Sequence, residues 1–383
     1  MILCKKHNGD NIMFTNPFYY GGAVKDNHFC NRVDEIKELS DDIQAGLNIL
    51  IYAPRRFGKT SFVLKTLEKL EKENNIQYIF LDIFHISTID EFINLYFNAI
   101  ASSLEKPTDK IINFFKSIVN IRPNINVNFD SAGNPNFSLS INSENRMQTL
   151  EDVLNIPLHF AKEKKIVIAF DEFQQIAALD IEAKLRSIIQ LHSHKLSYVF
   201  MGSKKSILHN MFLDKNRPFY KSVKHFKIKE IQKNVWEEFI TSNFIKTNKT
   251  IDIKYIDKII NITKGFPYYT QQFAYELWIK TSNSVDDDIF TNTLKTIIER
   301  EEDLFSIEWD NLTLNQQKAL KIIIEKDGKN LYDEEYLVKY KLKIGSFQTA
   351  LKGLIQKDIV DKVKNIYYLQ DPLFEYWLKN KTN

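Results

Sequence analysis

One segment of the sequence, Leu47–Ser61, restricts the fold of this chain more than any other. It opens with an apolar run that ends at Tyr52 and is typical of a buried strand. A turn that contains Pro54 and Gly58 follows, and apolar residues at helical spacing begin directly after it. A strand, a short loop and a helix in this order predict a loop whose backbone N–H groups, together with the helix N-terminus, surround an anion.

The residue types in this loop fit a nucleotide. In such loops the lysine, here Lys59, reaches the outer phosphates, and the hydroxyl of the next residue, here Thr60, binds Mg²⁺. The usual pattern is G-x-x-x-x-G-K-[ST], and Ala53 replaces its first glycine, which adds one methyl group and restricts φ. We predict nucleotide contacts along the whole loop, from Ala53, Pro54, Arg55, Arg56, Phe57, Gly58, Lys59, Thr60 and Ser61. The alternative is a basic loop after a core strand.

Size and charge limit the class of protein. The 383 residues exceed the length at which a single core usually stops growing, so two or three domains are expected. A hydrophobic content of 44%, with 28 Phe and 17 Tyr, is typical of a folded globular chain and not of a disordered one. With 52 basic and 49 acidic residues the net charge is only +3, so any nucleic-acid binding must be local.

Cysteine use and hydropathy exclude two further classes. Cys4 and Cys30 are the only cysteines and form no C-x-x-C pair, so neither a disulfide framework nor a zinc site is supported. No apolar run reaches the ~18 residues of a membrane span, and the N-terminus lacks the apolar region of a signal peptide. We therefore expect a cytoplasmic protein that does not bind a membrane.

Strand and helix patterns alternate between residues 46 and 233, after an N-terminal segment and covering helix in residues 1–45. This alternation predicts an α/β domain with a five-stranded parallel sheet and helices on both faces. Strands are expected at residues 47–52, 77–84, 165–171, 197–203 and 226–231, and helices at 33–45, 61–70, 89–104, 181–192 and 204–212. We expect one additional strand to lie between the phosphate-loop strand and the strand 165–171.

Two carboxylates follow the third of these strands. Open α/β sheets bind their ligands at the carboxyl ends of strands, which is where Asp171 and Glu172 fall. Asp171 is predicted to hold Mg²⁺, directly or through water, and Glu172 to take a proton from an attacking water. At the end of the fourth strand, two roles are open for Ser203: sensing the γ-phosphate through a water, or capping the next helix.

Residues 106–150 interrupt the alternation. Polar and apolar residues alternate at 126–130 and at 136–140 around Ala132-Gly133-Asn134-Pro135, which predicts a β-hairpin inserted at the sheet edge. Such a hairpin could grip a partner or serve as a structural flap, and the sequence does not choose between these roles.

The pattern is helical from residue 234 onward, and two more domains are expected. Residues 234–305 are predicted to form a helical lid, in which Gly265 ends one helix and Pro267 opens the next. In residues 306–383, three helices followed by a β-ribbon predict a winged helix. The expected helices are 312–325, 333–340 and one capped by Ser346, and the expected strands are 359–363 and 366–369.

The third helix of the winged helix is where a partner would bind. Its exposed face is expected to offer Gln348, Thr349, Lys352 and Gln356. A single lysine is a weak anchor for nucleic acid, because each neutralised phosphate needs a cation. We favour a protein partner or a packing role for this domain, and DNA binding is the alternative.

Five motifs together carry a resemblance to a known family. They are Ala-Pro-Arg-Arg-Phe-Gly-Lys-Thr at 53–60, Ile-Ala-Phe-Asp-Glu-Phe-Gln at 168–174, Phe-Met-Gly-Ser at 200–203, Pro-Phe-Tyr at 218–220 and Gly-Phe-Pro-Tyr-Tyr at 265–269. With these motifs the chain resembles the archaeal-type ATPases, a prokaryotic branch of AAA+ and STAND-like ATP-binding proteins with a C-terminal winged helix. The resemblance implies a P-loop sheet of the ASCE and AAA+ type, ATP as the nucleotide and Mg²⁺ as the metal.

The resemblance also implies roles for single residues. By this likeness, Lys59 and Thr60 bind phosphate and Mg²⁺. Asp171 and Glu172 are the Mg²⁺ ligand and the water-activating base, and Ser203 is the first sensor.

Two further implications concern the lid and a neighbouring subunit. The turn at Gly265 and Pro267 matches the lid turn that the family places near the base. AAA+ relatives take an arginine finger from the next subunit of an oligomer. Arg217 and, one helix earlier, Arg186 are the candidates for this role in a homo-oligomer.

Two functional hypotheses follow. The first is an ATP-hydrolysing switch, in which hydrolysis is slow without a partner or oligomer and moves the lid and winged helix. The second is a DNA-binding or scaffold protein with a structural nucleotide, in which Arg55, Arg56 and the wing at residues 362–364 contact phosphates. The first is favoured because an Asp-Glu pair at a strand end has little use in a purely structural site.

Overall fold

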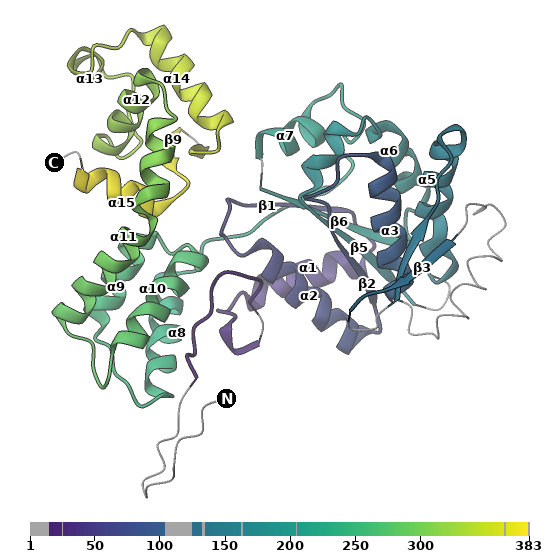
Figure 1. Cartoon of the computed structure of the whole chain (residues 1–383), viewed down its shortest axis with the longest axis horizontal. Coiled ribbons are helices and arrows are strands. Elements are labelled where there is room, and N and C mark those ends of the chain that lie inside the picture. The colour runs from purple at the N-terminus through teal and green to yellow at the C-terminus, as the bar shows by residue number, and fades with distance from the viewer. Residues whose placement is uncertain are drawn as a thin grey trace, which may run out of the picture. The chain divides into compact units, whose positions relative to one another are not determined.

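The structure is a computed structural model that describes residues 15–24, 26–103, 125–131, 135–161, 164–203, 205–363 and 365–381 (Figure 1). The chain forms two compact units. The sheet unit is residues 32–229, and the helical unit joins the described residues up to Asn31 with those from Glu230 onward. The chain therefore passes between the units at Asn31–Arg32 and again at Lys229–Glu230.

A five-stranded parallel sheet forms the centre of the sheet unit. Its strands, in spatial order, are β2 (Gln77–Asp82), β5 (Ile166–Asp171), β6 (Leu196–Gly202), β1 (Ile49–Tyr52) and β7 (Lys224–Lys227). The predicted parallel sheet is confirmed, and β6 is the predicted strand between the phosphate-loop strand and the carboxylate strand. Both β5 and β6 are buried along their whole length, which explains their nearly continuous apolar sequence.

Helices cover both faces of the sheet, as predicted. They are α1 (Val33–Gln44), α2 (Lys59–Asn74), α3 (Ile89–Ser103), α5 (Arg146–Asn155), α6 (Glu182–Leu191) and α7 (Lys205–Leu213), with short 3₁₀ helices η2 (Ser143–Asn145), η3 (Ile156–His159) and η4 (Phe173–Ala178). Helix α1 packs on α2, whereas α3, α5 and α6 pack on one another. Figure 1 shows these two groups on opposite sides of the sheet.

Aromatic side chains fill the core between the sheet and the α3 group. Phe170 of β5 stacks on Tyr198 and Phe200 of β6, with ring centroids 6.4 and 6.1 Å apart and rings within 5° of parallel. All three side chains are fully buried. Because large rings packed in this way resist displacement, they fix the carboxyl ends of β5 and β6, where the candidate site lies.

The predicted hairpin is confirmed in its two strands, β3 (Ile125–Phe129) and β4 (Pro135–Leu139), which pair antiparallel. The predicted turn residues 132–134 and residues 106–124 of the predicted insertion lie outside the described residues. Strand β4 docks on α3, because the N–H groups of Phe137 and Leu139 donate to the side-chain oxygens of Asn98 and Asn94 at 2.9 and 2.6 Å. Phe137 and Leu139 are also part of the core, so β4 has a structural role.

Four helices make up the lid part of the helical unit: α8 (Lys233–Ile245), α9 (Ile253–Thr263), α10 (Pro267–Lys280) and α11 (Asp287–Asp310). Pro267 is the first residue of α10, as predicted. Gly265 has φ +67°, and its carbonyl accepts a hydrogen bond from the indole of Trp236 at 3.2 Å.

The winged helix is also confirmed, and its elements are α12 (Leu314–Glu325), α13 (Glu334–Lys339), α14 (Ile344–Gln356), β8 (Val360–Val363) and β9 (Ile366–Leu369), followed by α15 (Pro372–Lys381). The prediction that Ser346 caps the third helix is wrong. Helix α14 begins at Ile344 with Lys343 as its N-cap, because the carbonyl of Lys343 already accepts the N–H of Phe347 at 2.9 Å. The predicted wing residue Lys364 lies outside the described residues.

Helix α15 joins the winged helix to the lid. Glu375 forms an ion pair with Lys264 at the end of α9, and Asp371 accepts a hydrogen bond from Tyr269 of α10. The N-terminal segment, which contains η1 (Asp26–His28), packs on the lid helices through Phe18, a buried ring against α8. In the part of the chain that the structure describes, no helix is long and apolar enough to cross a membrane.

Candidate nucleotide-binding site

The predicted phosphate loop connects the end of β1 to the first residue of α2. Gly58 is the N-cap of α2 and has φ +81°, a left-handed conformation that glycine adopts without strain. Arg56 also has a positive φ, +61°, so the loop turns sharply twice. Gly58 has no side chain to cap the helix, so the loop leads directly into the N-terminus of α2, where the backbone N–H groups and the helix dipole favour an anion.

Lys59 lies inside this loop. Its ammonium group donates hydrogen bonds to the carbonyl oxygens of Ala53 and Pro54 at 2.9 and 3.1 Å, and the residue is only 7% exposed. Burial lowers the pKa of Lys59 to about 8, although the nearby carboxylates of Asp171 and Glu172 act in the opposite direction. The loop therefore holds a buried cation that a bound anion would stabilise.

Thr60 connects the loop to the carboxylate strand. Its hydroxyl donates to Oδ2 of Asp171 at 2.6 Å, and the backbone N–H of Glu172 donates to Oδ1 of Asp171 at 2.9 Å. Burial raises the pKa of Asp171, and these two hydrogen bonds oppose the rise. The sheet register explains the contact: Tyr52, which precedes the loop, pairs with Gly202, and Phe170, which precedes Asp171, pairs with Phe200.

Glu172 continues this group of side chains. It follows β5 in a left-handed conformation, with φ +55° and ψ +39°, and its Oε2 accepts a hydrogen bond from the hydroxyl of Ser203 at 3.1 Å. The same Oε2 accepts a hydrogen bond from the amide of Gln174 on η4. The structure thus brings Lys59, Thr60, Asp171, Glu172 and Ser203 together at one edge of the sheet.

The candidate arginines make contacts elsewhere in the sheet unit. Arg217, in the turn after α7, forms an ion pair with Glu182 at the start of α6. Arg186 donates to the side chain of Gln190 at 2.9 Å. Pro267, which was predicted to contact the nucleotide, belongs to the helical unit.

Two residues near the site were not among the predicted ones. Gln174 is 5% exposed and contacts Glu172, and its only sequence signal was its place at the end of the 168–174 motif. Arg32 is 5% exposed and its guanidinium lies 5.6 Å from the ring of Phe57, which is buried in the loop between exposed Arg56 and Gly58. No sequence motif marked Arg32, because its contacts with Phe57 and Lys229 join residues that are distant in the sequence.

Side chains beside the phosphate loop are candidate ligands for a metal ion. Among the described residues, no cluster of three or more His, Cys, Asp or Glu side chains is arranged to hold a metal ion. Thr60 and Asp171 offer two hard oxygen atoms side by side, which suits Mg²⁺, since this ion is usually held by one or two carboxylates, waters and the phosphates of a substrate.

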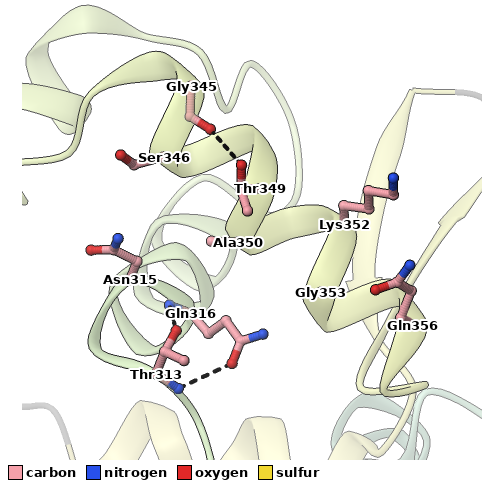
Figure 2. A pocket seen from close by; sticks show the side chains of 10 residues that line it. All are labelled: Thr313, Asn315, Gln316, Gly345, Ser346, Thr349, Ala350, Lys352, Gly353 and Gln356. Carbon is pink, nitrogen blue, oxygen red and sulfur yellow. Dashed lines mark hydrogen bonds between the residues drawn. The ribbon is translucent and has the colours of Figure 1, made fainter.

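A second concave surface lies on the winged helix. A groove of about 580 Å³ lies between the start of α12 and one side of α14. Figure 2 shows the side chains that line it. Its lining is Thr313, Asn315, Gln316, Gly345, Ser346, Thr349, Ala350, Lys352, Gly353 and Gln356. Within this lining, Lys352 carries the only charge, so the groove is polar but nearly neutral. The four predicted contact residues of α14 are exposed, as expected.

Comparison with solved structures supports the fold. A Walker-type ATPase of Pyrococcus abyssi superposes with a TM-score of 0.65 and 18% identity over 92% of this chain and 96% of that one. The ORC2 protein of Aeropyrum pernix, solved as ADPNP-ADP complexes, gives a TM-score of 0.52 and 12% identity over 92% of this chain and 95% of that one. At these identities the likeness concerns the fold alone.

Comparison with families and with curated proteins gives two further results. No curated protein matches the sequence significantly. Residues 303–380 match a family described as a probable winged helix domain. Residues 29–273 match the family described as an ATPase domain predominantly from Archaea. Because this match spans more than half of the chain and the fold agrees with it, the chain belongs to this archaeal-type ATPase family.

Proposed function

We propose that this protein is an ATP hydrolase that acts as a nucleotide-dependent switch. The observation that carries the proposal is the hydrogen bond of 2.6 Å between Thr60 and Asp171. It joins a phosphate-binding loop on β1 to a pair of carboxylates on β5, although the two strands are not neighbours in the sheet. An arrangement that brings a lysine, a hydroxyl and two carboxylates to one helix N-terminus fits phosphoryl transfer to water.

The residues divide the work of hydrolysis as follows. The first-turn N–H groups of α2 and Lys59 bind the phosphates, and Lys59 exchanges its two carbonyl partners for phosphate oxygens. Thr60 and Asp171 would hold Mg²⁺, which, when bound, neutralises phosphate charge. Glu172 orients a water and takes one proton as the water oxygen bonds to the γ-phosphorus. The bond from that phosphorus to the bridging oxygen breaks, and ADP leaves with the electron pair.

Adenine nucleotides are the favoured substrates. The family is one of ATPase domains, and the structural neighbour from Aeropyrum pernix was solved with ADPNP and ADP. We extend this preference for adenine nucleotides to the present chain as part of the proposal. The other predicted contacts to the nucleotide, from Ala53, Pro54, Arg55, Arg56, Phe57, Gly58, Ser61 and Pro267, are part of the proposal as well.

The switch consists of movement between the two compact units. Only two chain segments connect them, at Asn31–Arg32 and Lys229–Glu230, so nucleotide-dependent changes in the sheet unit can alter the position of the lid and winged helix. In a homo-oligomer, Arg217 would leave Glu182 and act on the nucleotide of a neighbouring subunit, with Ser203 as the sensor within the same subunit. Such an arginine adds ~10³- to 10⁵-fold in rate, so the isolated subunit should turn over slowly.

The test is single-turnover hydrolysis of ATP with protein in excess, as a function of protein concentration. We expect Glu172→Gln to bind ATP as the native protein does and to lose at least ~100-fold in rate, because it removes the base but keeps the shape of the side chain. Lys59→Ala should bind ATP weakly and serves as the blank. Native turnover no faster than this blank, or equal rates for the native protein and Glu172→Gln, would reject the proposal.

For the winged helix we propose a protein partner, because the groove between α12 and α14 is polar and carries a single charge. The alternative is a DNA-binding or scaffold protein with a structural nucleotide. That alternative predicts duplex binding whose log affinity falls by ~0.9 per phosphate neutralised as log salt rises. Absence of duplex binding at low salt would exclude it.

A further inference from the structure

Two hydrogen-bond donors hold one oxygen of the Glu172 carboxylate. The hydroxyl of Ser203 and the amide Nε2 of Gln174 both donate to Oε2, and the other oxygen, Oε1, receives neither of these bonds. The two donors come from different elements, since Ser203 directly follows β6 and Gln174 lies on η4. They therefore fix the carboxylate plane relative to the sheet.

The orientation of the Gln174 amide follows from this contact. A carboxylate oxygen only accepts hydrogen bonds, so the NH₂ group must face Glu172 and the carbonyl oxygen must face away. That carbonyl oxygen is buried and, among the described residues, has no hydrogen-bond partner. An unsatisfied buried carbonyl is unfavourable, and such groups are rare in folded proteins. The fold nevertheless keeps the Gln174 amide in the orientation that bonds Glu172.

The backbone of β6 leaves room for this amide. A Cβ atom at Gly202 would lie 2.2 Å from Oε1 of Gln174 and 2.8 Å from a methyl carbon of Leu208. Both distances are shorter than van der Waals contact, so any other residue at position 202 would displace the glutamine or its neighbour. Gly202 is thus a steric condition for the contact between Gln174 and Glu172.

We infer that Gln174 is a positioning residue for hydrolysis: it holds Oε2 of Glu172 so that Oε1 faces the attacking water. This inference rests on the proposed ATP hydrolysis and adds to it a residue that does not touch the substrate. The glutamine acts through the geometry of the base, and a base displaced by about 1 Å can lose about 100-fold in rate.

The first experiment removes the donor and keeps the volume. Gln174→Met should lower kcat about 10- to 100-fold in steady-state hydrolysis with ATP in excess and leave KM for ATP within about threefold, because ground-state binding does not use Glu172. The matched control is Gln175→Met, the same replacement one residue further along η4, which should hydrolyse ATP at the native rate. A kcat for Gln174→Met equal to that of Gln175→Met would overturn the inference.

A double-mutant cycle separates positioning from a general structural role. If Gln174 acts through Glu172, adding Gln174→Met to Glu172→Gln should change the residual rate by less than about twofold, since no base remains to be oriented. If the second substitution instead lowers the residual rate by the same factor as in the native background, Gln174 supports the fold and the inference fails.

A third variant reaches the same contact from the opposite strand. Gly202→Ala should lower kcat with little change in KM, as Gln174→Met does, and the two effects should be less than multiplicative when combined. Thermal unfolding of each variant shows whether the fold is retained. If the native protein itself does not hydrolyse ATP, the proposed function fails and the inference with it. If native hydrolysis is observed and Gln174→Met matches it, the inference alone fails.

Discussion

The buried ammonium of Lys59 makes nucleotide binding depend on pH. In the free protein burial lowers the pKa of Lys59 to about 8, with Arg55 acting in the same direction and the carboxylates of Asp171 and Glu172 in the other. A bound phosphate favours the charged form and raises this pKa. Protons are therefore taken up on binding above pH 8, and affinity should fall as the pH rises through and beyond that value.

The expected result is a dissociation constant for ADP that is flat near neutral pH and rises by up to about tenfold per pH unit above pH 8, from linkage between proton and ligand binding. Isothermal titration calorimetry at several pH values measures it. Lys59→Met should bind weakly with no such dependence. A native profile that is flat up to about pH 9.5, near the usual lysine range, would contradict the prediction.

Single residues of the site were predictable from sequence where they belong to a short motif whose spacing is typical of a functional group. Lys59, Thr60 and the Asp171-Glu172 pair followed from motifs that lie beside a strand end, and the structure brings them together. Gln174 was not predictable, because its role depends on Gly202, a residue on another strand. No spacing rule along the chain encodes that contact.

At the scale of secondary-structure elements, the turn after α12 has no room for a side chain at position 328 of the winged helix. Gly328 has φ +71°, and a Cβ there would lie 1.7 Å from the backbone carbonyl oxygen of Tyr367 on β9. The same glycine accepts a hydrogen bond from the N–H of Tyr367 at 3.0 Å. The end of α12 and the wing can therefore meet only if residue 328 has no side chain.

We expect Gly328→Ala to destabilise the winged helix by about 2–4 kcal/mol, from backbone strain and the steric clash. The matched control is Gly345→Ala on α14, where a Cβ meets nothing within 4 Å and φ is not positive. This control should stabilise the helix by about 0.5–1 kcal/mol, since alanine loses less backbone entropy than glycine. Urea denaturation of the full chain, followed by tryptophan fluorescence, measures both. Equal stabilities would contradict the prediction.

Elements were predicted best where apolar periodicity was long. Strands β1, β2, β5 and β6 and most helices lie close to their expected ranges, and β7 ends four residues before the expected Ile231. Helix α5 was missed although Leu150, Val153 and Leu154 have helical spacing and are buried. The hairpin signal before it masked this pattern. The cap at Ser346 was wrong because a serine near a helix start does not show which turn is the first.

At the scale of the whole molecule, the two chain segments that connect the units are tied to each other. Arg32 donates to the carbonyl oxygen of Lys229 at 2.7 Å and pairs with Glu35 at 2.9 Å. Glu35 in turn accepts the N–H of Lys229 at 3.0 Å. These contacts fix the start of α1 beside the segment after β7, within the sheet unit. The proximity of this pair is a property of the fold, since its members are about two hundred residues apart in sequence.

Arg32 also connects these two chain segments to the phosphate loop, because its guanidinium lies over the ring of Phe57. Nucleotide binding that orders the loop should therefore reduce hydrogen exchange at Lys229, whose N–H is held by Glu35. Arg32→Ala should raise exchange there at least about tenfold without nucleotide, and should remove the effect of ADP, because removing one partner of a buried pair leaves the other uncompensated.

The matched control is Lys224→Ala. Lys224 joins β7 to α1 through Glu38 and Asp42, whereas Arg32 joins the start of α1 to the segment after β7. The side chain of Lys224 is 40% exposed. Exposed ion pairs contribute about 0–1 kcal/mol, and exchange at Lys229 should change by less than about fivefold in this variant and still respond to ADP. If exchange at Lys229 in Arg32→Ala is the same as in Lys224→Ala, the side chain of Arg32 does not hold the two connecting segments together. In that case any movement of the lid and winged helix must be triggered from another part of the sheet unit.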